Sequence, residues 1–299
     1  MKIARFVLWI VLSLVAVATI VIFEINSWPA GNSVCGVFLG FILPQIYYSF
    51  QNLFDNSSWK SSQRKLERGD FIDRDTIVRI SFAYLFRIKY SNYYFLVPNT
   101  HNTGKFQPVG GVYKFEDDEK IVLQNDFHII DDEKIPLTES SRNDYRLQMK
   151  NKYLRRFVKR FEKELRRENV TNLSREFKEE VVKTGLLNWT KIRYRFCGRK
   201  YSDLKFSEPF QIYELHIADI VELIPTKEQA KDLEKLYKEN SDKYLFATKD
   251  QVMKHGVNMF PGDCRERIGD HTKNILQESE DGLVKVRRVN QTFSVSLKD

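Results

Sequence analysis

The feature that most constrains this chain is an unbroken apolar run near its N-terminus, residues 6–23, in which only Ser13 and Thr19 are polar. A helix of this length rises about 27 Å, close to the thickness of a bilayer's hydrocarbon core. The run exceeds the apolar part of an ordinary signal peptide, and no small-x-small cleavage motif follows it. It therefore predicts a transmembrane helix.

A second apolar stretch, residues 34–50, follows an uncharged turn and contains Pro44 and Gln45. We expect it to return through the membrane, so that residues 1–52 form a transmembrane hairpin with spans at about 6–23 and 34–50. Cationic flanks stay on the cytoplasmic side of a membrane, and here they occur at both ends of the hairpin. They are Lys2 and Arg5 before it, and Lys60, Arg64, Lys65 and Arg68 after it. The sequence thus predicts a multi-pass protein with both termini in the cytoplasm.

Gly36 and Gly40 lie four residues apart on the second stretch. A GxxxG spacing removes side chains from one helix face and lets another backbone approach closely. Two partners are open at this point. One is the first span of the same molecule, and the other is a second copy of the chain.

The rest of the chain predicts a linker, residues 53–75, and one domain, residues 76–299. The net charge is +8, and the anchor contributes only +1 of it through Lys2 and Arg5 against Glu24, which leaves +7 outside. Such a surface favours phosphate-bearing ligands or anionic lipid headgroups. The linker is polar and charged, which predicts a flexible stalk with at most one helical turn. The three cysteines are far apart and indicate neither a disulfide framework nor a zinc site.

Alternating strand and helix patterns predict an α+β domain. Residues 143–167 carry an apolar stripe with many cations off it, which predicts a basic amphipathic helix. This helix packs on its own domain, lies on an anionic membrane or lines a phosphate-binding groove. The other expected elements are strands at 77–90, 93–97, 107–115, 192–196 and 210–223, a helix at 173–183 stopped by Gly185, and a helix opened by the capping box of Thr226 and Gln229.

The stretch of residues 175–180, Arg-Glu-Phe-Lys-Glu-Glu, carries the chemistry. Glu176, Glu179 and Glu180 are three or four residues apart, so a helix gathers them on one surface. Carboxylates this close repel each other unless a cation lies among them, and Mg²⁺ prefers oxygen ligands. The competing reading is a solvated acidic face relieved by Lys178 and Lys183.

The order of two strands, a glycine pair and an acidic helix resembles the Nudix family. Its signature is G-x5-E-x7-R-E-U-x-E-E-x-G-U, with U an aliphatic residue. Gly110 and Glu116 match the first part, and residues 175–180 match the core with Phe177 at U. The resemblance covers residues 76–275 and implies a Nudix-like α/β/α sandwich.

The resemblance also implies functional roles for individual residues. In the family the helix glutamates hold a divalent metal, which suggests Mg²⁺ at Glu176, Glu179 and Glu180. Glu179 and Glu180 would be catalytic if the domain is a hydrolase. The residues expected at a ligand are Gly110, Gly111 and Arg175.

Two departures separate the chain from that signature. Glu116 and Arg175 are separated by 58 residues instead of seven, which predicts an insertion at about residues 117–170. Val182 also stands where the family has glycine. The domain could therefore bind a nucleotide without cleaving it.

Apolar spans before a divergent Nudix domain resemble the two-transmembrane Nudix effectors of bacterial CBASS antiphage systems, also described as SMODS-associated Nudix proteins. That resemblance implies an inner-membrane protein that binds a cyclic nucleotide made by a partner CD-NTase. It would then form homo-oligomers that disrupt the lipid bilayer and cause abortive infection, and it would bind no nucleic acid polymer. We expect bases to stack on rings among Tyr84, Phe86, Tyr93 and Tyr94. The alternative is a membrane-tethered, Mg²⁺-dependent Nudix hydrolase of a nucleoside diphosphate derivative.

Overall fold

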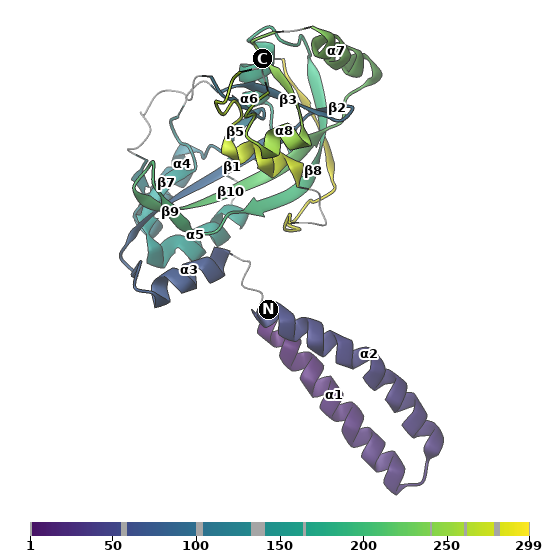
Figure 1. Ribbon diagram of the computed structural model, residues 1–299. Coiled ribbons are helices and arrows are strands. Elements are labelled where there is room, and N and C mark those ends of the chain that lie inside the picture. Colours follow the sequence, from purple (N-terminus) through teal and green to yellow (C-terminus); the bar gives the residue numbers. More distant parts are fainter. Residues whose placement is uncertain are drawn as a thin grey trace. The chain divides into compact units, whose positions relative to one another are not determined.

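The computed structural model describes residues 2–54, 59–99, 104–132, 141–163, 166–239, 241–259, 262–277 and 282–298. The side chains of residues 2–5, 29, 30, 32 and 48–54 lie outside this description. The chain forms two compact units, Met1–Ser61 and Ser62–Asp299 (Figure 1).

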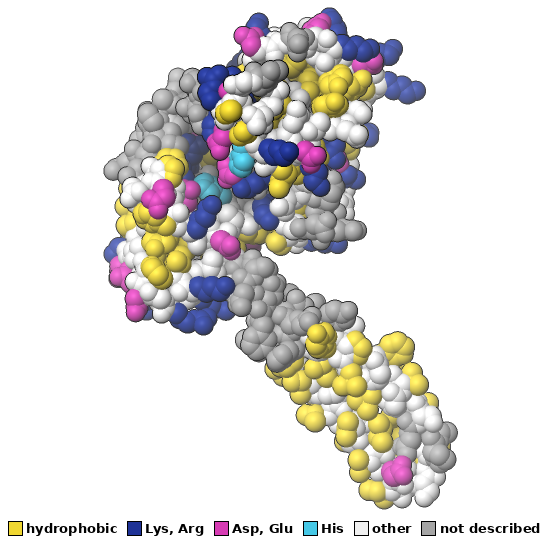
Figure 2. All heavy atoms as spheres, viewed as in Figure 1, with side chains coloured by type: hydrophobic (Ala, Val, Ile, Leu, Met, Phe, Trp, Pro, Cys, Tyr) yellow, Lys and Arg dark blue, Asp and Glu magenta, His cyan; other side chains and the backbone are white. Residues whose placement is uncertain are grey.

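The first unit contains a helical hairpin of α1 (Lys2–Ile25) and α2 (Pro29–Phe54). Within α1, Phe6–Ile25 is long and apolar enough to cross a membrane, with a mean hydropathy of 2.9. The apolar part of α2 is shorter, Ser33–Tyr47. Figure 2 shows hydrophobic side chains over much of the hairpin surface. The structure therefore supports one membrane-spanning helix, while full crossing by the second stays a prediction.

The start of α2 lies in close contact with the end of α1. A β-carbon at Gly31 would overlap the ring of Phe23, and that ring packs edge-on against Trp28 at 4.8 Å. A β-carbon at Gly36 or Gly40 would meet no described atom within 4 Å. The prediction that this GxxxG packs against the first span of the same molecule is therefore wrong. The glycine face is turned away from that span.

The second unit is built on a mixed sheet of eight strands. Its order is β12-β8-β10-β1-β7-β6, with β5 pairing β1 and β9 pairing β10. β1 is parallel to β10 and antiparallel to both β5 and β7. The strands are β1 (Ile77–Arg87), β5 (Gly110–Val112), β6 (Ile130–Asp131), β7 (Arg146–Lys150), β8 (Lys191–Tyr201), β9 (Lys205–Ser207), β10 (Ile212–Leu223) and β12 (Thr292–Ser296).

A smaller sheet and several helices complete this unit. The small sheet contains β2 (Lys89–Tyr90), β3 (Tyr93–Pro98), β4 (Phe106–Gln107) and β11 (Leu245–Thr248). The helices are α3 (Trp59–Arg68), α4 (Asp117–Phe127), α5 (Asn151–Lys163), α6 (Arg175–Phe177), the π-helix η1 (Lys178–Val182), α7 (Lys227–Lys238), α8 (Lys249–Met253) and the 3-10 helix η2 (Asp270–Leu276).

The side chains of β1 alternate between two buried layers, as expected for a strand covered on both faces. On one face Phe82 stacks on Phe161 of α5, with ring centroids 3.7 Å apart. On the other, Leu85 belongs to a core cluster with Leu96 of the small sheet and Ile275 of η2. This arrangement confirms the expected α+β fold.

The basic amphipathic helix is shorter than expected. Residues 146–150 form β7, and α5 begins only at Asn151. Its apolar stripe is buried in the domain, so the packing alternative is correct for the described part of the helix. Leu165 lies outside the described residues. The buried members are Leu154, Phe157, Val158 and Phe161.

The insertion leaves and rejoins the sheet at one place. Phe115 bridges Arg167, and the Glu168 N–H donates to the Lys114 carbonyl at 2.8 Å. Between these points the described residues supply β6 and β7 to the main sheet. Arg160 donates to both oxygens of the fully buried Glu119, at 2.6 Å each. The insertion is thus an integral part of the domain.

The expected flexible stalk is wrong from Ser62 onward. Gln63 donates to Asn151 Oδ1 at 2.5 Å and accepts from Arg155 Nε at 2.7 Å. Both Gln63 and Asn151 are almost completely buried. Because these polar groups are satisfied by α5, the second half of α3 is a fixed part of the domain.

Candidate functional site

The acidic helix is short and irregular. α6 has three residues and continues as the π-helix η1. Phe177 fixes it to the core, stacked on Trp189 and edge-on to Phe86. π-Turns are rare and are frequent at functional sites. After η1, Gly185 adopts a φ of +74°, which ends the helix where the sequence predicted a stop.

Glu180 turns from η1 toward the glycine pair. It accepts from the Gly110 N–H at 3.0 Å and from Gln107 Nε2 at 3.3 Å. Burial raises the pKa of Glu180 to about 8 even though the bond from Gly110 favours the ionised form. This carboxyl can therefore carry a proton at neutral pH, as a general acid must.

Neighbouring groups approach the glycine pair closely. Gly110 has a φ of +151°, and a β-carbon there would overlap the Tyr84 carbonyl oxygen. At Gly111 a β-carbon would overlap the carboxylate of Glu176. The structure thus brings Gly110, Gly111 and two of the predicted glutamates together.

Arg175 joins two carboxylates to the sheet. It donates to the Val112 carbonyl at 2.8 Å, to Glu168 at 3.2 Å and to Glu176. Burial raises the pKa of Glu176 despite this ion pair. Arg175 Nε is buried and has no hydrogen-bond partner among the described residues.

Glu168 is the residue of this cluster that the sequence did not predict. Besides Arg175, it accepts from the Tyr84 hydroxyl at 3.1 Å and from the Lys114 N–H at 3.4 Å. Glu116, matched to the signature by spacing, is exposed at the start of α4. The position of Glu168, seven residues before Arg175 and close to the family spacing, was the signal available in the sequence.

The insertion adds charges beside this cluster. Lys114 Nζ lies 3.0 Å from Asp144, and Arg146 lies 3.9 Å from the same carboxylate. Burial is the main cause that raises the pKa of Asp144, while Lys114, Arg146 and Arg175 act to lower it. Lys114, Arg146 and Arg175 therefore all lie close enough to Asp144 to affect its pKa, a grouping that sequence spacing did not reveal.

The carboxylates suit Mg²⁺ in kind, because they offer hard oxygen donors. Their arrangement does not suit it, since Glu176 is held by Arg175 and Glu180 by Gly110, while Glu179 is exposed. Among the described residues, no three His, Cys, Asp or Glu side chains are placed to hold a metal ion.

The rings expected to stack on a ligand are mostly core residues. Tyr84 and Phe86 are fully buried in β1, and Tyr94 is nearly so. Tyr93 is half-buried and packs against Tyr237, with centroids 4.8 Å apart. Three of the four rings thus pack the domain, because β1 and β3 are covered on both faces.

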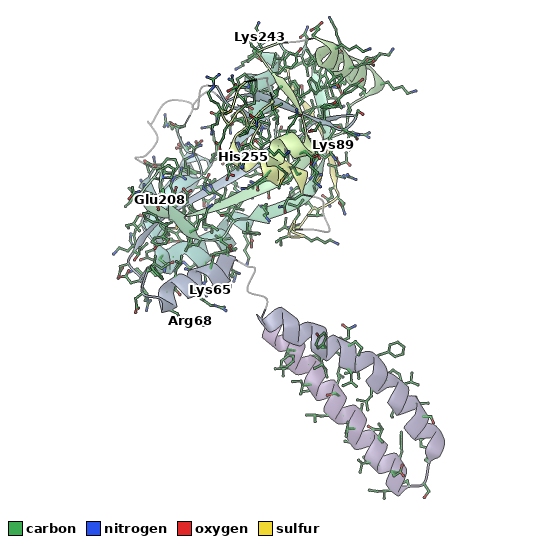
Figure 3. All side chains as sticks on the ribbon, in the orientation of Figure 1. Lys65, Arg68, Lys89, Glu208, Lys243 and His255 are labelled. Carbon is green, nitrogen blue, oxygen red and sulfur yellow. The ribbon has the colours of Figure 1, made fainter. Side chains whose placement is uncertain are left out.

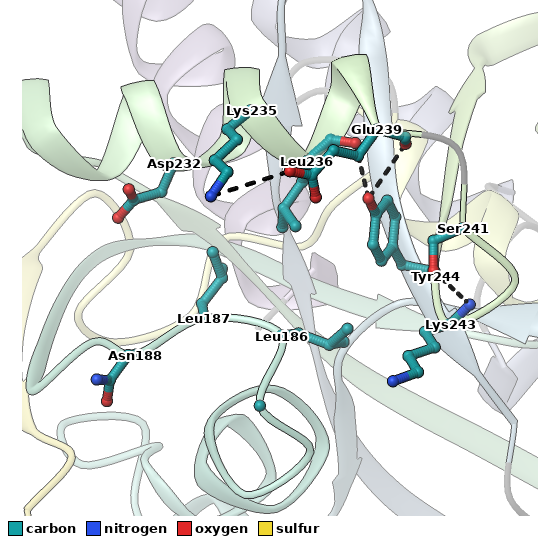
Figure 4. A pocket seen from close by; sticks show the side chains of 11 residues that line it. Leu186, Leu187, Asn188, Asp232, Lys235, Leu236, Glu239, Ser241, Lys243 and Tyr244 are labelled. Carbon is teal, nitrogen blue, oxygen red and sulfur yellow. Dashed lines mark hydrogen bonds and ion pairs between the residues drawn. The ribbon is translucent and has the colours of Figure 1, made fainter.

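A separate pocket of about 660 Å³ lies between α7, the turn after η1 and the residues before β11 (Figure 4). The positive and negative charges of its lining side chains are equal in number. The Tyr244 hydroxyl in its wall donates to the carbonyls of Leu236 and Glu239. It includes none of the signature residues. Its charged lining residues are Asp232, Lys235, Glu239 and Lys243.

The mixed sheet, the glycine pair and the Arg-Glu-x-x-Glu-Glu helix define a Nudix-type domain. The family model of the SMODS-associated NUDIX domain matches residues 77–276, and the chain belongs to that family. No curated protein and no solved structure matches the chain. Family membership supports an association with CBASS-type effectors, and Nudix domains generally use divalent metals such as Mg²⁺.

Proposed function

We propose that this chain is a membrane effector of a CBASS antiviral defence system. The observation that carries the proposal is the joining, in one chain, of a membrane-length apolar helix to a SMODS-associated NUDIX domain. The domain binds a cyclic nucleotide made by a partner CD-NTase. The anchors then cluster and disrupt the inner membrane, which causes abortive infection.

The ligand site of this proposal is the charged cluster at the edge of β5. Lys114, Arg146 and Arg175 offer cations for the phosphates of a cyclic nucleotide, and their carboxylate partners can be exchanged for those phosphates. Gly110 and Gly111 keep the backbone close to the same place. Burial of the cluster strengthens each of these interactions.

Gating requires that the ligand bind the clustered state better than the dispersed state, because equal affinity shifts no equilibrium. The outward-facing Gly36 and Gly40 supply a surface on which two anchors can approach closely. Crosslinking of the full chain in bilayers, with and without a panel of cyclic nucleotides, tests this model. A larger oligomer with one nucleotide supports gating, and the same oligomer under all conditions contradicts it.

The second candidate is a membrane-tethered Nudix hydrolase acting on a nucleoside diphosphate derivative. It is favoured by one observation, the buried Glu180 whose pKa is raised into the range useful for proton transfer. For Mg²⁺ to bind at Glu176, Glu179 and Glu180, the ion pair between Glu176 and Arg175 would have to break. Replacing Glu179 and Glu180 by Gln should abolish turnover, whereas Glu116→Gln should not. Unchanged turnover in the double variant would exclude this function for the helix.

A further inference from the structure

The exposed face of α3 is cationic. Arg64, Lys65 and Arg68 are exposed, and no ion pair among the described residues involves them. Figure 3 labels Lys65 and Arg68 on this face. Unpaired cations on a helix surface normally serve solubility, so a partner must be argued from a second feature.

Glu67, the acidic residue of α3, lies on the inward face of the helix and not on its cationic face. Glu67 accepts from Asn151 Nδ2 at 2.9 Å, and Ser62 Oγ accepts from the Leu204 N–H at 2.8 Å. Together with the buried Gln63, these contacts fix which face is exposed. The cationic face therefore cannot rotate toward the domain without breaking buried hydrogen bonds.

An exposed aromatic ring ends the cationic face. The Gly69 N–H bonds to the Lys65 carbonyl, the Phe71 N–H bonds to the Leu66 carbonyl, and Asp70 adopts a φ of +56°. This cap places Phe71 directly after the helix with 67% of its surface exposed. Between Arg64 and Phe71, Asp70 is the one exposed acid, against three exposed cations. Cations beside an exposed ring are typical of surfaces that lie at a membrane interface.

We infer that the surface made by Arg64, Lys65, Arg68 and Phe71 binds the anionic lipid headgroups of the leaflet that anchors the chain. Only residues 55–61 separate the last residue of α2 from Ser62, so the chain limits their separation to about 30 Å. Each Lys or Arg near an anionic surface favours binding by about fivefold. The inference rests on the membrane anchoring of the proposed function but not on its ligand.

The test is hydrogen exchange of residues 62–75 in the full chain, held in nanodiscs of phosphatidylcholine with or without phosphatidylglycerol. We expect anionic lipid to slow exchange on the order of fivefold. The triple variant Arg64→Gln, Lys65→Gln and Arg68→Gln should lose this dependence. A matched variant with three other exposed cations changed, Lys183→Gln, Lys191→Gln and Arg193→Gln, should retain it.

Equal exchange in the two lipid compositions would overturn the inference. It would also be overturned if both triple variants lost the dependence of exchange on anionic lipid to the same extent. The same slowing by inorganic phosphate in neutral discs would overturn it too, because it would assign a phosphate site. A chain that is not retained in the discs at all would contradict the anchor itself. That outcome is recognised by gel filtration before exchange is measured.

Discussion

At the scale of single residues, Glu168 shows how a side chain that is distant from the glycine pair in sequence joins the Arg175 cluster. Spacing selects Glu116, which is separated from Gly110 by five residues. The structure instead gives Arg175 and Tyr84 a glutamate from the far end of the insertion. Linear spacing could not indicate this contact, because Phe115 and Arg167 are 52 positions apart in sequence and yet are paired neighbours.

This assignment predicts unequal effects of two conservative substitutions. Glu168→Gln weakens a mostly buried ion pair and should lower the free energy of unfolding by about 1–3 kcal/mol. Glu116→Gln alters an exposed side chain and should change it by less than about 0.5 kcal/mol. Thermal unfolding of both full-length variants in one detergent measures the difference. Equal destabilisation would contradict the role given to Glu168.

The raised pKa of Glu180 predicts a pH dependence with a definite sign. Burial raises this pKa to about 8, above an unfolded value of about 4.3. Between these values the folded state binds more protons than the unfolded state, so stability falls as pH rises. The loss amounts to at most about 1.4 kcal/mol per pH unit.

The comparison of wild type with Glu180→Gln isolates this group. Both proteins should have similar Tm values near pH 5, where Glu180 is protonated. Glu180→Gln should become the more stable of the two by pH 9, because glutamine never ionises. A Tm difference that does not change with pH would show that the carboxyl titrates normally.

At the scale of elements, local sequence signals located much of the fold. The capping box of Thr226 and Gln229 opens α7 as predicted, and Tyr93–Pro98 is the expected strand. Periodicity misplaced the start of α5, because the cation-rich residues 146–150 pair with β1 as β7. The fixed α3 escaped prediction because its polar side chains are satisfied by partners on α5 that are distant in sequence.

The docking of α3 predicts a specific effect of Asn151→Ala. This side chain accepts from Gln63 and donates to Glu67 and to the Asp73 carbonyl. Its loss leaves buried polar groups unsatisfied and should destabilise the contact by about 1–3 kcal/mol. Trypsin should then cut the full chain faster after Arg64, Lys65 and Arg68. The exposed Asn188→Ala serves as the control and should leave the cleavage rate unchanged.

The exposed face of Gly36 and Gly40 predicts that larger side chains there affect crosslinking between copies and not the single hairpin. Leucine at Gly36 and Gly40 should fit the single hairpin, since nothing described lies within 4 Å of either position. It should weaken crosslinking between copies by blocking close approach of two backbones. Val37→Leu on the same helix is the matched control. Crosslinking that survives the double glycine variant would remove this face from the clustering model.

At the scale of the whole molecule, the sequence predicted a membrane anchor and a Nudix domain, and the family match over residues 77–276 confirms the domain. The charged cluster could not be read from sequence, because its members are distant along the chain and meet only in the folded domain. Lys114, Asp144 and Arg146 meet only because β7 continues the edge of β1 that β5 begins. Residues of the insertion thus lie beside the Nudix helix, with Arg175 close enough to affect Asp144.

The measurement that tests the account most directly is calorimetric titration of the detergent-solubilised full chain with cyclic di- and trinucleotides plus Mg²⁺, followed by chromatography of the mixtures. A fragment starting at Asp70 would lack the α3 residues that pair with Asn151. The account predicts that one cyclic nucleotide binds tightly and is recovered intact. Failure of every nucleotide to bind, or loss of the bound nucleotide that is abolished by Glu179→Gln, would contradict a sensing effector.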